Sequence, residues 1–105
     1  MGILDGTGTK ENEGSYKNNE REGKWIFYFE TGGVADIMTF SMGKLAGKCT
    51  SYYKDGKTKE ISNYKLGRTN EKSEYVSIKH GEWILYDSKG REVKREKYKN
   101  GKKTS

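Results

Sequence analysis

Apolar and polar residues alternate over short segments of this sequence, and glycines separate the segments. The segments that precede a glycine include WIFYF, CTSYY and WILYD, and those that follow one include VADIMTF, KTKEISNY and REVKREKY. Short runs rich in aromatic and β-branched residues and bounded by glycine are typical of β-strands. Three successive pairs of such runs predict three β-hairpins.

The glycines keep one register along the chain. Blocks begin at Gly23, Gly47 and Gly81, and in each block a second glycine follows nine residues on and a third twenty residues on. A tyrosine recurs five residues into each block, and an aromatic residue recurs seventeen residues in. The recurring residues are Gly32, Gly56 and Gly90; Gly43, Gly67 and Gly101; Tyr28, Tyr52 and Tyr86; and Phe40, Tyr64 and Tyr98. Self-similarity of this kind indicates a repeat architecture.

The turns predict how the strands pair. The loops Thr31-Gly32, Asp55-Gly56 and Lys89-Gly90 suit two-residue primed turns, because Asp-Gly is among the strongest short-range hairpin signals. Straight pairing across such loops sets Trp25 opposite Met38, Ile26 opposite Ile37, and the opening glycine of each block opposite its late aromatic residue. A β-bulge would shift these partners by one residue.

The blocks predict one repeat domain over residues 1–105. It comprises a partial repeat at 1–22, repeats at 23–46 and 47–67, an insertion at 68–80 and a last repeat at 81–102. The insertion is expected to break the array locally. Counting back from Gly32, Phe40 and Gly43 places Gly8, Tyr16 and Asn19 in the partial repeat, whose first strand would then lie outside the sequence. We expect a truncated chain or a domain that begins within a hairpin, and in both cases an open N-terminal sheet edge at which self-association could occur.

The segments GKWIFYFETGG, GKCTSYYKDGK and GEWILYDSKGR resemble the bacterial MORN-variant repeat over residues 8–102. The resemblance implies an all-β fold, an elongated single-layer antiparallel meander of tandem MORN-type hairpins. It also implies a binding role, since this family is commonly labelled antitoxin-like and eukaryotic MORN repeats are associated with protein scaffolding and phosphoinositide-containing membranes. Two features depart from the pattern: Cys49 replaces the tryptophan of the other blocks, and the insertion has no counterpart in a regular array.

Composition limits the function classes. Only 30% of residues are hydrophobic and the net charge is +6, which lies near the composition of disordered chains, but eight tyrosines and two tryptophans can supply contact area on a sheet. No base and nucleophile stand at a recognisable spacing, so we expect no enzyme and no cofactor. One cysteine and one histidine exclude a Cys/His zinc site within the chain. The longest apolar run, residues 25–29, is too short to span a membrane, so we expect a soluble chain. A single cysteine leaves the compartment undecided, with the cytoplasm favoured.

Two single residues have alternative interpretations. Cys49 could be a reactive thiol, but its alignment with Trp25 and Trp83 predicts a packed, inert position. His80, just before Gly81, could be a pH-sensitive contact, although a simple loop residue is the favoured interpretation.

Exposed aromatic residues predict the interaction surface. A single-layer sheet cannot hide both faces, so we expect a strip that binds a protein partner, made of Tyr28, Tyr52, Tyr53 and Tyr86 together with Trp25 and Trp83. The open N-terminal edge is the other surface at which a protein could bind. The alternative is electrostatic binding of an anionic membrane surface or nucleic acid by C-terminal basic residues, namely Lys94, Arg95, Lys97, Lys99 and Lys102. Residues 91–105 carry seven basic side chains and two acidic ones. Lysine on a terminal strand also protects against edge-to-edge aggregation, which is the commoner role.

Overall fold

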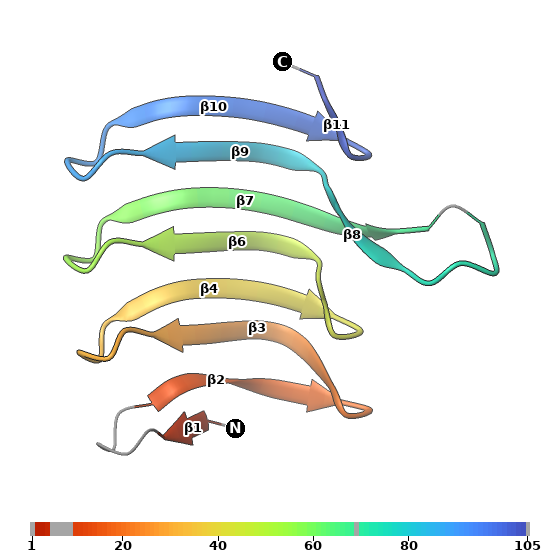
Figure 1. The fold of residues 1–105 in the computed structure, drawn as a ribbon, viewed down its shortest axis with the longest axis horizontal. Helices are drawn as coiled ribbons and strands as arrows, with labels where there is room; N and C mark the ends of the chain where they lie inside the picture. Colours follow the sequence, from red (N-terminus) through yellow and green to blue (C-terminus); the bar gives the residue numbers. More distant parts are fainter. Residues whose placement is uncertain (1, 5–9, 69, 105) are drawn as a thin grey trace.

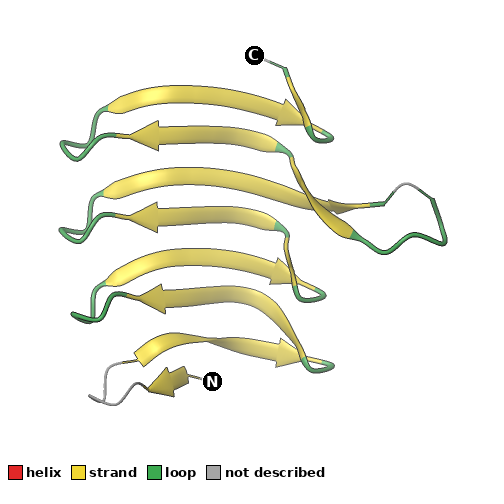
Figure 2. Cartoon of the chain, viewed as in Figure 1, coloured by secondary structure: helices red, strands yellow, loops and turns green. Residues whose placement is uncertain are grey.

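The chain forms one open antiparallel sheet of stacked hairpins (Figure 1). The computed structural model describes residues 2–4, 10–68 and 70–104, and within them only strands, turns and loops occur (Figure 2). The strands are β1 (Gly2–Leu4), β2 (Lys10–Lys17), β3 (Glu20–Tyr28), β4 (Val34–Ser41), β5 (Lys44–Leu45), β6 (Gly47–Tyr52), β7 (Thr58–Gly67), β8 (Val76–Lys79), β9 (Gly81–Tyr86), β10 (Glu92–Lys99) and β11 (Lys102–Lys103).

The strands follow one another across the sheet as a meander. Their order is β1-β2-β3-β4-β6-β7-β9-β10-β11, and the short strands β5 and β8 extend the pairing of β4 and β7. The molecule measures 46 × 39 × 14 Å, and the shortest dimension leaves room for a single layer only. The all-β, single-layer meander predicted from the sequence is confirmed.

The predicted pairing register is also confirmed. Trp25 lies opposite Met38, and Ile26 lies opposite Ile37. Each opening glycine lies opposite the late aromatic residue of its block, in the pairs Gly23–Phe40, Gly47–Tyr64 and Gly81–Tyr98. Gly47 and Gly81 have φ values of +113° and +114°, which side chains rarely tolerate, so an aromatic partner covers backbone that must stay bare.

The two-residue primed turns predicted at Thr31-Gly32, Asp55-Gly56 and Lys89-Gly90 are wrong. In the first hairpin the Phe29 amide donates to Gly33 O and the Gly32 amide donates to Phe29 O, which encloses a three-residue loop. The other two hairpins repeat this pattern. A β-bulge then adds one residue to the second strand, since Phe27 pairs with Asp36 whereas Tyr28 pairs with Val34. The extra loop residue and the bulge cancel, and for that reason the register was predicted correctly from the wrong turn.

Two-residue primed turns do occur, at the opposite side of the sheet. Positive φ angles at both central residues mark the turns Asn18-Asn19, Met42-Gly43 and Asn100-Gly101. Asn19, with a φ of 65°, therefore takes the left-handed conformation that its alignment with Gly43 implied.

The N-terminal partial repeat keeps the register of the others. Gly2 pairs with Glu13 and Ile3 pairs with Asn12, as Ile26 pairs with Ile37 and Phe27 with Asp36 one repeat later. The expectation that its first strand lies outside the sequence is therefore wrong, because β1 pairs with β2 in the place that residues 26–28 take in the next repeat. Gly8, the second glycine of this partial repeat, lies outside the described residues.

The insertion does not break the array. It lengthens one hairpin, in which β7 continues to Gly67 and pairs with β8, and this hairpin projects from the side of the sheet (Figure 1). Beyond it, β9 returns to β7 and restores the inter-repeat pairs Glu60–Leu85 and Ile61–Ile84. Ten additional residues fit because they lengthen this hairpin beyond the ends of the neighbouring strands, where β8 pairs with β7 alone.

Alternation along the strands gives the sheet two distinct faces. The tryptophan face carries Trp25, Phe27, Phe40, Cys49, Tyr64, Trp83 and Tyr98. The isoleucine face carries Ile26, Ile37, Ile61 and Ile84, together with Tyr28, Tyr52 and Tyr86. Most of the core lies on the tryptophan face, where Trp25 is 0% exposed, Phe40 8% and Cys49 6%, whereas Ile84 at 7% is the one fully buried hydrophobic residue described on the other face.

The repeats are joined on the tryptophan face by recurring contacts. The Trp25 indole Nε1 donates to Ser15 O at 3.0 Å, and the Trp83 Nε1 donates to Asn63 O at 3.0 Å, in each case one repeat earlier. Each ring meets the edge of an aromatic residue of that earlier repeat, with centroid distances of 5.0 Å from Tyr16 to Trp25 and 5.2 Å from Tyr64 to Trp83. A cation lies over each indole, the Arg21 guanidinium at 4.7 Å and the Lys79 ammonium at 4.5 Å.

Candidate interaction surface

The three repeat tyrosines lie together on the isoleucine face. Tyr28, Tyr52 and Tyr86 hold the same place at the end of the first strand of their hairpins, opposite Val34, Thr58 and Glu92. Each is half-buried, so part of each ring remains accessible. The Tyr28 hydroxyl donates to the Glu13 carboxylate, and this hydrogen bond raises the pKa of Tyr28. The three tyrosines therefore share one face of the sheet, and partner binding by them stays a prediction.

The tryptophans do not belong to this surface. Trp25 and Trp83 lie one residue away from the isoleucine positions and therefore point to the opposite face. Trp25 is 0% exposed, so its ring has no surface to offer a partner. The expected strip that combined these tryptophans with the tyrosines is wrong. In both blocks the tryptophan and the tyrosine lie an odd number of residues apart on one strand, so alternation places them on opposite faces.

Tyr53 adds to the packing between two hairpins. Its hydroxyl donates to Tyr86 O at 2.7 Å, and the Lys59 ammonium lies 5.8 Å from its ring centroid. Tyr53 is half-buried and directly follows the strand that carries Tyr52. It links the tyrosine ends of two neighbouring repeats.

The isoleucine face also carries residues, between the tyrosines and the primed turns, that were not predicted as part of the surface. Ile26, Ile37, Thr50, Ile61 and Ile84 form an unbroken series of cross-strand neighbours. Beside them run Lys24, Lys48 and Lys97, which are exposed and have no ion pair within 12–68 and 70–104, the residues whose side chains the structure describes. These residues lie one, three, fourteen and sixteen residues after the opening glycine of their blocks, and this regular spacing was visible in the sequence.

The C-terminal basic residues divide between the two faces. Lys94 lies on the tryptophan face, 3.7 Å from the Glu96 carboxylate, which also accepts from Lys103 at 2.8 Å. Arg95 lies on the other face and pairs with Glu82 and Glu92, and these hydrogen bonds raise its pKa. Lys97, Lys99 and Lys102 are exposed on the isoleucine face without an ion pair among the described side chains. Three of the five predicted anion-binding residues thus have no acidic partner among the described side chains.

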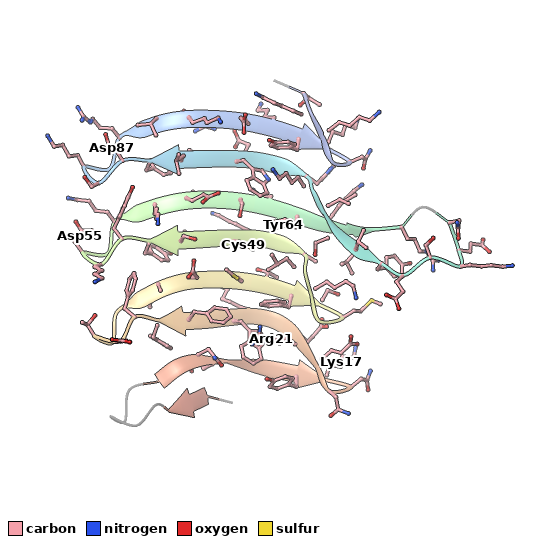
Figure 3. All side chains as sticks on the ribbon, in the orientation of Figure 1. Lys17, Arg21, Cys49, Asp55, Tyr64 and Asp87 are labelled. Atoms are coloured by element: carbon pink, nitrogen blue, oxygen red, sulfur yellow. The ribbon has the colours of Figure 1, made fainter. Side chains whose placement is uncertain are left out.

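Titratable groups elsewhere have structural roles. The carboxylates of Asp55 and Asp87 accept backbone amides in the hairpin loops, at the same side of the sheet (Figure 3), and these bonds lower their pKa values. Burial raises the pKa of the Cys49 thiol, against smaller opposing effects of hydrogen bonds to Thr39 and Ser62. The packed position predicted for Cys49 is confirmed, and a raised pKa disfavours the reactive thiolate.

His80 is a half-buried loop residue. Its Nδ1 accepts the Asn100 amide at 3.1 Å and so ties the start of β9 to the last turn. His80 also lines a hollow of about 440 Å³ with Tyr98, Lys97 and Lys99. Among the described residues no three metal-binding side chains cluster, and no helix is long and apolar enough to cross a membrane.

Comparison with known families supports the repeat. Two adjacent segments, residues 21–41 and 45–66, match the MORN repeat variant. The block that begins at Gly81 lies outside the matched segments, but it forms a third hairpin with the same pairing register. No curated protein and no solved structure matches the chain significantly.

Proposed function

We propose that this chain is a non-catalytic protein-interaction module that binds its partner through the isoleucine face. MORN repeats are commonly associated with protein and membrane binding, and two segments of the chain match the MORN repeat variant. Among the described residues no group of three metal-binding side chains occurs. An antitoxin-like role, which the resemblance implies, would be one case of such binding.

The tyrosine row carries the proposal. Tyr28, Tyr52 and Tyr86 repeat on one face beside half-buried Ile26, Ile37 and Ile61 and buried Ile84, and no other described element covers that face of the single layer. Tyrosine combines a large apolar ring with a hydroxyl and is enriched among residues that dominate binding energy. Alanine at a central position of this kind typically costs about 2 kcal/mol or more of binding free energy.

A capture experiment tests the proposal. The chain serves as bait in a native lysate, with parallel washes at about 0.1 M and about 1 M salt, between which the Debye length falls from about 10 to about 3 Å. We expect a discrete protein that is retained at high salt by the wild type and lost by Tyr52→Ala and by Tyr86→Ala. Leu85→Ala is the matched control, because Leu85 is 38% exposed next to Tyr86 but lies on the tryptophan face. Equal capture by all four proteins would refute the proposed surface.

A second candidate function is electrostatic adhesion to an anionic membrane surface or nucleic acid. The free ammonium groups of Lys97, Lys99 and Lys102 on one face favour it. Binding of that kind weakens steeply with salt. A ligand that is released at about 1 M salt and is insensitive to Tyr52→Ala would support it over the protein-interaction module.

A further inference from the structure

The isoleucine face is organised in three parallel rows that cross the strands. The tyrosine row is Tyr28, Tyr52 and Tyr86; the isoleucine row is Ile26, Ile37, Thr50, Ile61 and Ile84; the lysine row is Lys24, Thr39, Lys48, Asn63, Glu82 and Lys97. Hydrogen bonds join the lysine row across repeats, from Thr39 Oγ1 to Lys48 O at 2.8 Å and from Asn63 Nδ2 to Glu82 O at 2.9 Å. The rows therefore run along the stacking direction of the repeats and not along any one strand.

The spacing within the isoleucine row matches the pitch of an α-helix. Neighbouring strands lie about 4.8 Å apart, and a helix rises about 5.4 Å per turn, so a helix laid across the strands offers about one apolar side chain to each strand. The row crosses β3, β4, β6, β7 and β9, which is about 19 Å, the length of a helix of about 13 residues. An extended segment on the same path would place side chains on one face about every 6.6 Å and lose this register.

The spacing between the rows matches the width of a helix. Residues two apart on a strand are separated by about 6.7 Å, so the tyrosine and lysine rows lie about 13 Å apart with the isoleucines between them. An α-helix with its side chains is about 10–12 Å across. The molecule is a single layer, 14 Å in its shortest dimension, so no second layer of the described residues lies over this face.

Charge fixes the chemistry of one flank of such a helix. Lys24, Lys48 and Lys97 are exposed and unpaired among the described side chains, whereas the one acid of their row, Glu82, is neutralised by Arg95. The opposite flank meets tyrosine rings, which accept apolar or uncharged polar neighbours. Carboxylates along the lysine flank would complement the surface.

We propose that the occupant of the isoleucine face is an amphipathic α-helix of a partner protein, about 13 residues long, with an apolar stripe and an acidic flank. This inference rests on the proposed function and specifies its ligand. The helix lies across the strands, its apolar stripe on the isoleucine row and its acidic flank on the lysine row.

Synthetic peptides test the inference with the complete chain. The probe is a fluorescein-labelled 14-residue peptide with leucines at i, i+3, i+7 and i+10 and glutamates along one flank. One matched peptide carries lysine in place of every glutamate, and another carries a central proline, which prevents a continuous helix. Binding is followed by fluorescence anisotropy and helix formation by circular dichroism.

We expect saturable binding of the glutamate peptide with a gain in helicity, about tenfold weaker binding of the lysine peptide, and loss of binding with the proline peptide. The double variant Lys24→Glu/Lys48→Glu should reverse the preference between the first two peptides. Lys54→Glu, in an exposed hairpin loop, is the matched control and should not alter it. Circular dichroism of the variants confirms that the sheet persists.

The outcomes separate this inference from the proposed function. Absence of saturable binding, or equal binding of the glutamate and lysine peptides, overturns the acidic helix. If Tyr52→Ala still abolishes capture of a protein from lysate in that case, the interaction surface stands and only its ligand is wrong. Binding to phosphatidylserine-containing vesicles in place of the peptides also overturns the inference, and it transfers the lysine row to the electrostatic candidate.

Discussion

Consecutive repeats meet at junctions on the tryptophan face. The junctions at Trp25 and at Cys49 both pair a large side chain with a small one, but in opposite order. In the Trp25 junction the facing residue of the earlier repeat is Gly14, and a Cβ added there would lie 2.3–2.5 Å from the indole. In the Cys49 junction the register of the pairs Asp36–Ser51 and Ile37–Thr50 continues to place Met38 opposite Cys49. A large residue meets a small one in both, and only the order is exchanged.

The third junction supports the same rule. The pairs Glu60–Leu85 and Ile61–Ile84 continue to place Ser62 opposite Trp83, again a small residue facing an indole. Close packing requires that the two sides of a junction fill one volume together, and a residue type at a repeat position can therefore change only with its neighbour. Cys49 departs from the tryptophan of the other blocks, but together with Met38 it keeps the combination of one large and one small residue.

Removal of the indole should give the largest effect. Trp25→Ala is expected to lower the free energy of unfolding by about 3–5 kcal/mol, because it leaves a cavity in the best-buried site and frees Ser15 O. Cys49→Ala should cost only about 1 kcal/mol, because few atoms are removed. Urea denaturation of both variants makes the comparison, and equal losses would contradict the difference between the junctions.

Filling the space at Gly14 comes next. Gly14→Ala should destabilise by about 1–3 kcal/mol, since its methyl group would overlap the Trp25 ring. Gly33→Ala is the control: its Cβ would meet Phe29 at an ordinary 3.8 Å, and we expect a change within about 0.5 kcal/mol. A neutral Gly14→Ala would show that the indole can move aside.

Exchanging the large and the small residue at the Cys49 junction tests this packing rule directly. Cys49→Trp alone should destabilise by about 1–3 kcal/mol through overpacking against Met38. The double variant Met38→Ser/Cys49→Trp recreates the combination of Ser62 and Trp83 and should recover at least about 1 kcal/mol of that loss in a double-mutant cycle. Additive effects of the two changes would mean that the residues do not share a volume.

The smallest effect concerns the thiol. Burial raises the folded-state pKa of Cys49 above its ordinary value of 9.0, so the folded state favours the neutral thiol. The corresponding stability is complete below pH 9 and is lost as the pH rises through the folded-state pKa. Cys49→Ala should remove this decline when urea midpoints are compared at pH 8 and just above pH 9, and a decline that persists unchanged would have to be assigned to other groups.

The two faces show where prediction from the sequence succeeds and where it fails. The register of Trp25 with Met38 was predicted from the position of the turn, and it is right because the extra loop residue and the β-bulge cancel. The assignment of Trp25 and Trp83 to the tyrosine surface failed although both lie within a few residues of Tyr28 and Tyr86. Residues an odd number of positions apart on a strand point to opposite faces, so the alternation of side chains would have separated these residues without a structure.

The lysine and isoleucine rows needed the structure for a different reason. Lys24, Lys48 and Lys97 lie far apart in sequence and have no shared local pattern beyond their block positions. They become a row only because the pairs between repeats, such as Ile37–Thr50 and Ile61–Ile84, fix each hairpin against the last. The insertion at 68–80 could have shifted that alignment, and the return of β9 to β7 shows that it did not.

The sequence by itself determined the hairpins and the order of the repeats, because glycine turns and alternation act over a few residues. The tertiary structure alone decided how the loop and bulge compensate, which side chains share a junction volume, and which charges align across repeats. These depend on contacts between strands of different hairpins, and close packing makes each such position conditional on a neighbour that the local sequence does not contain.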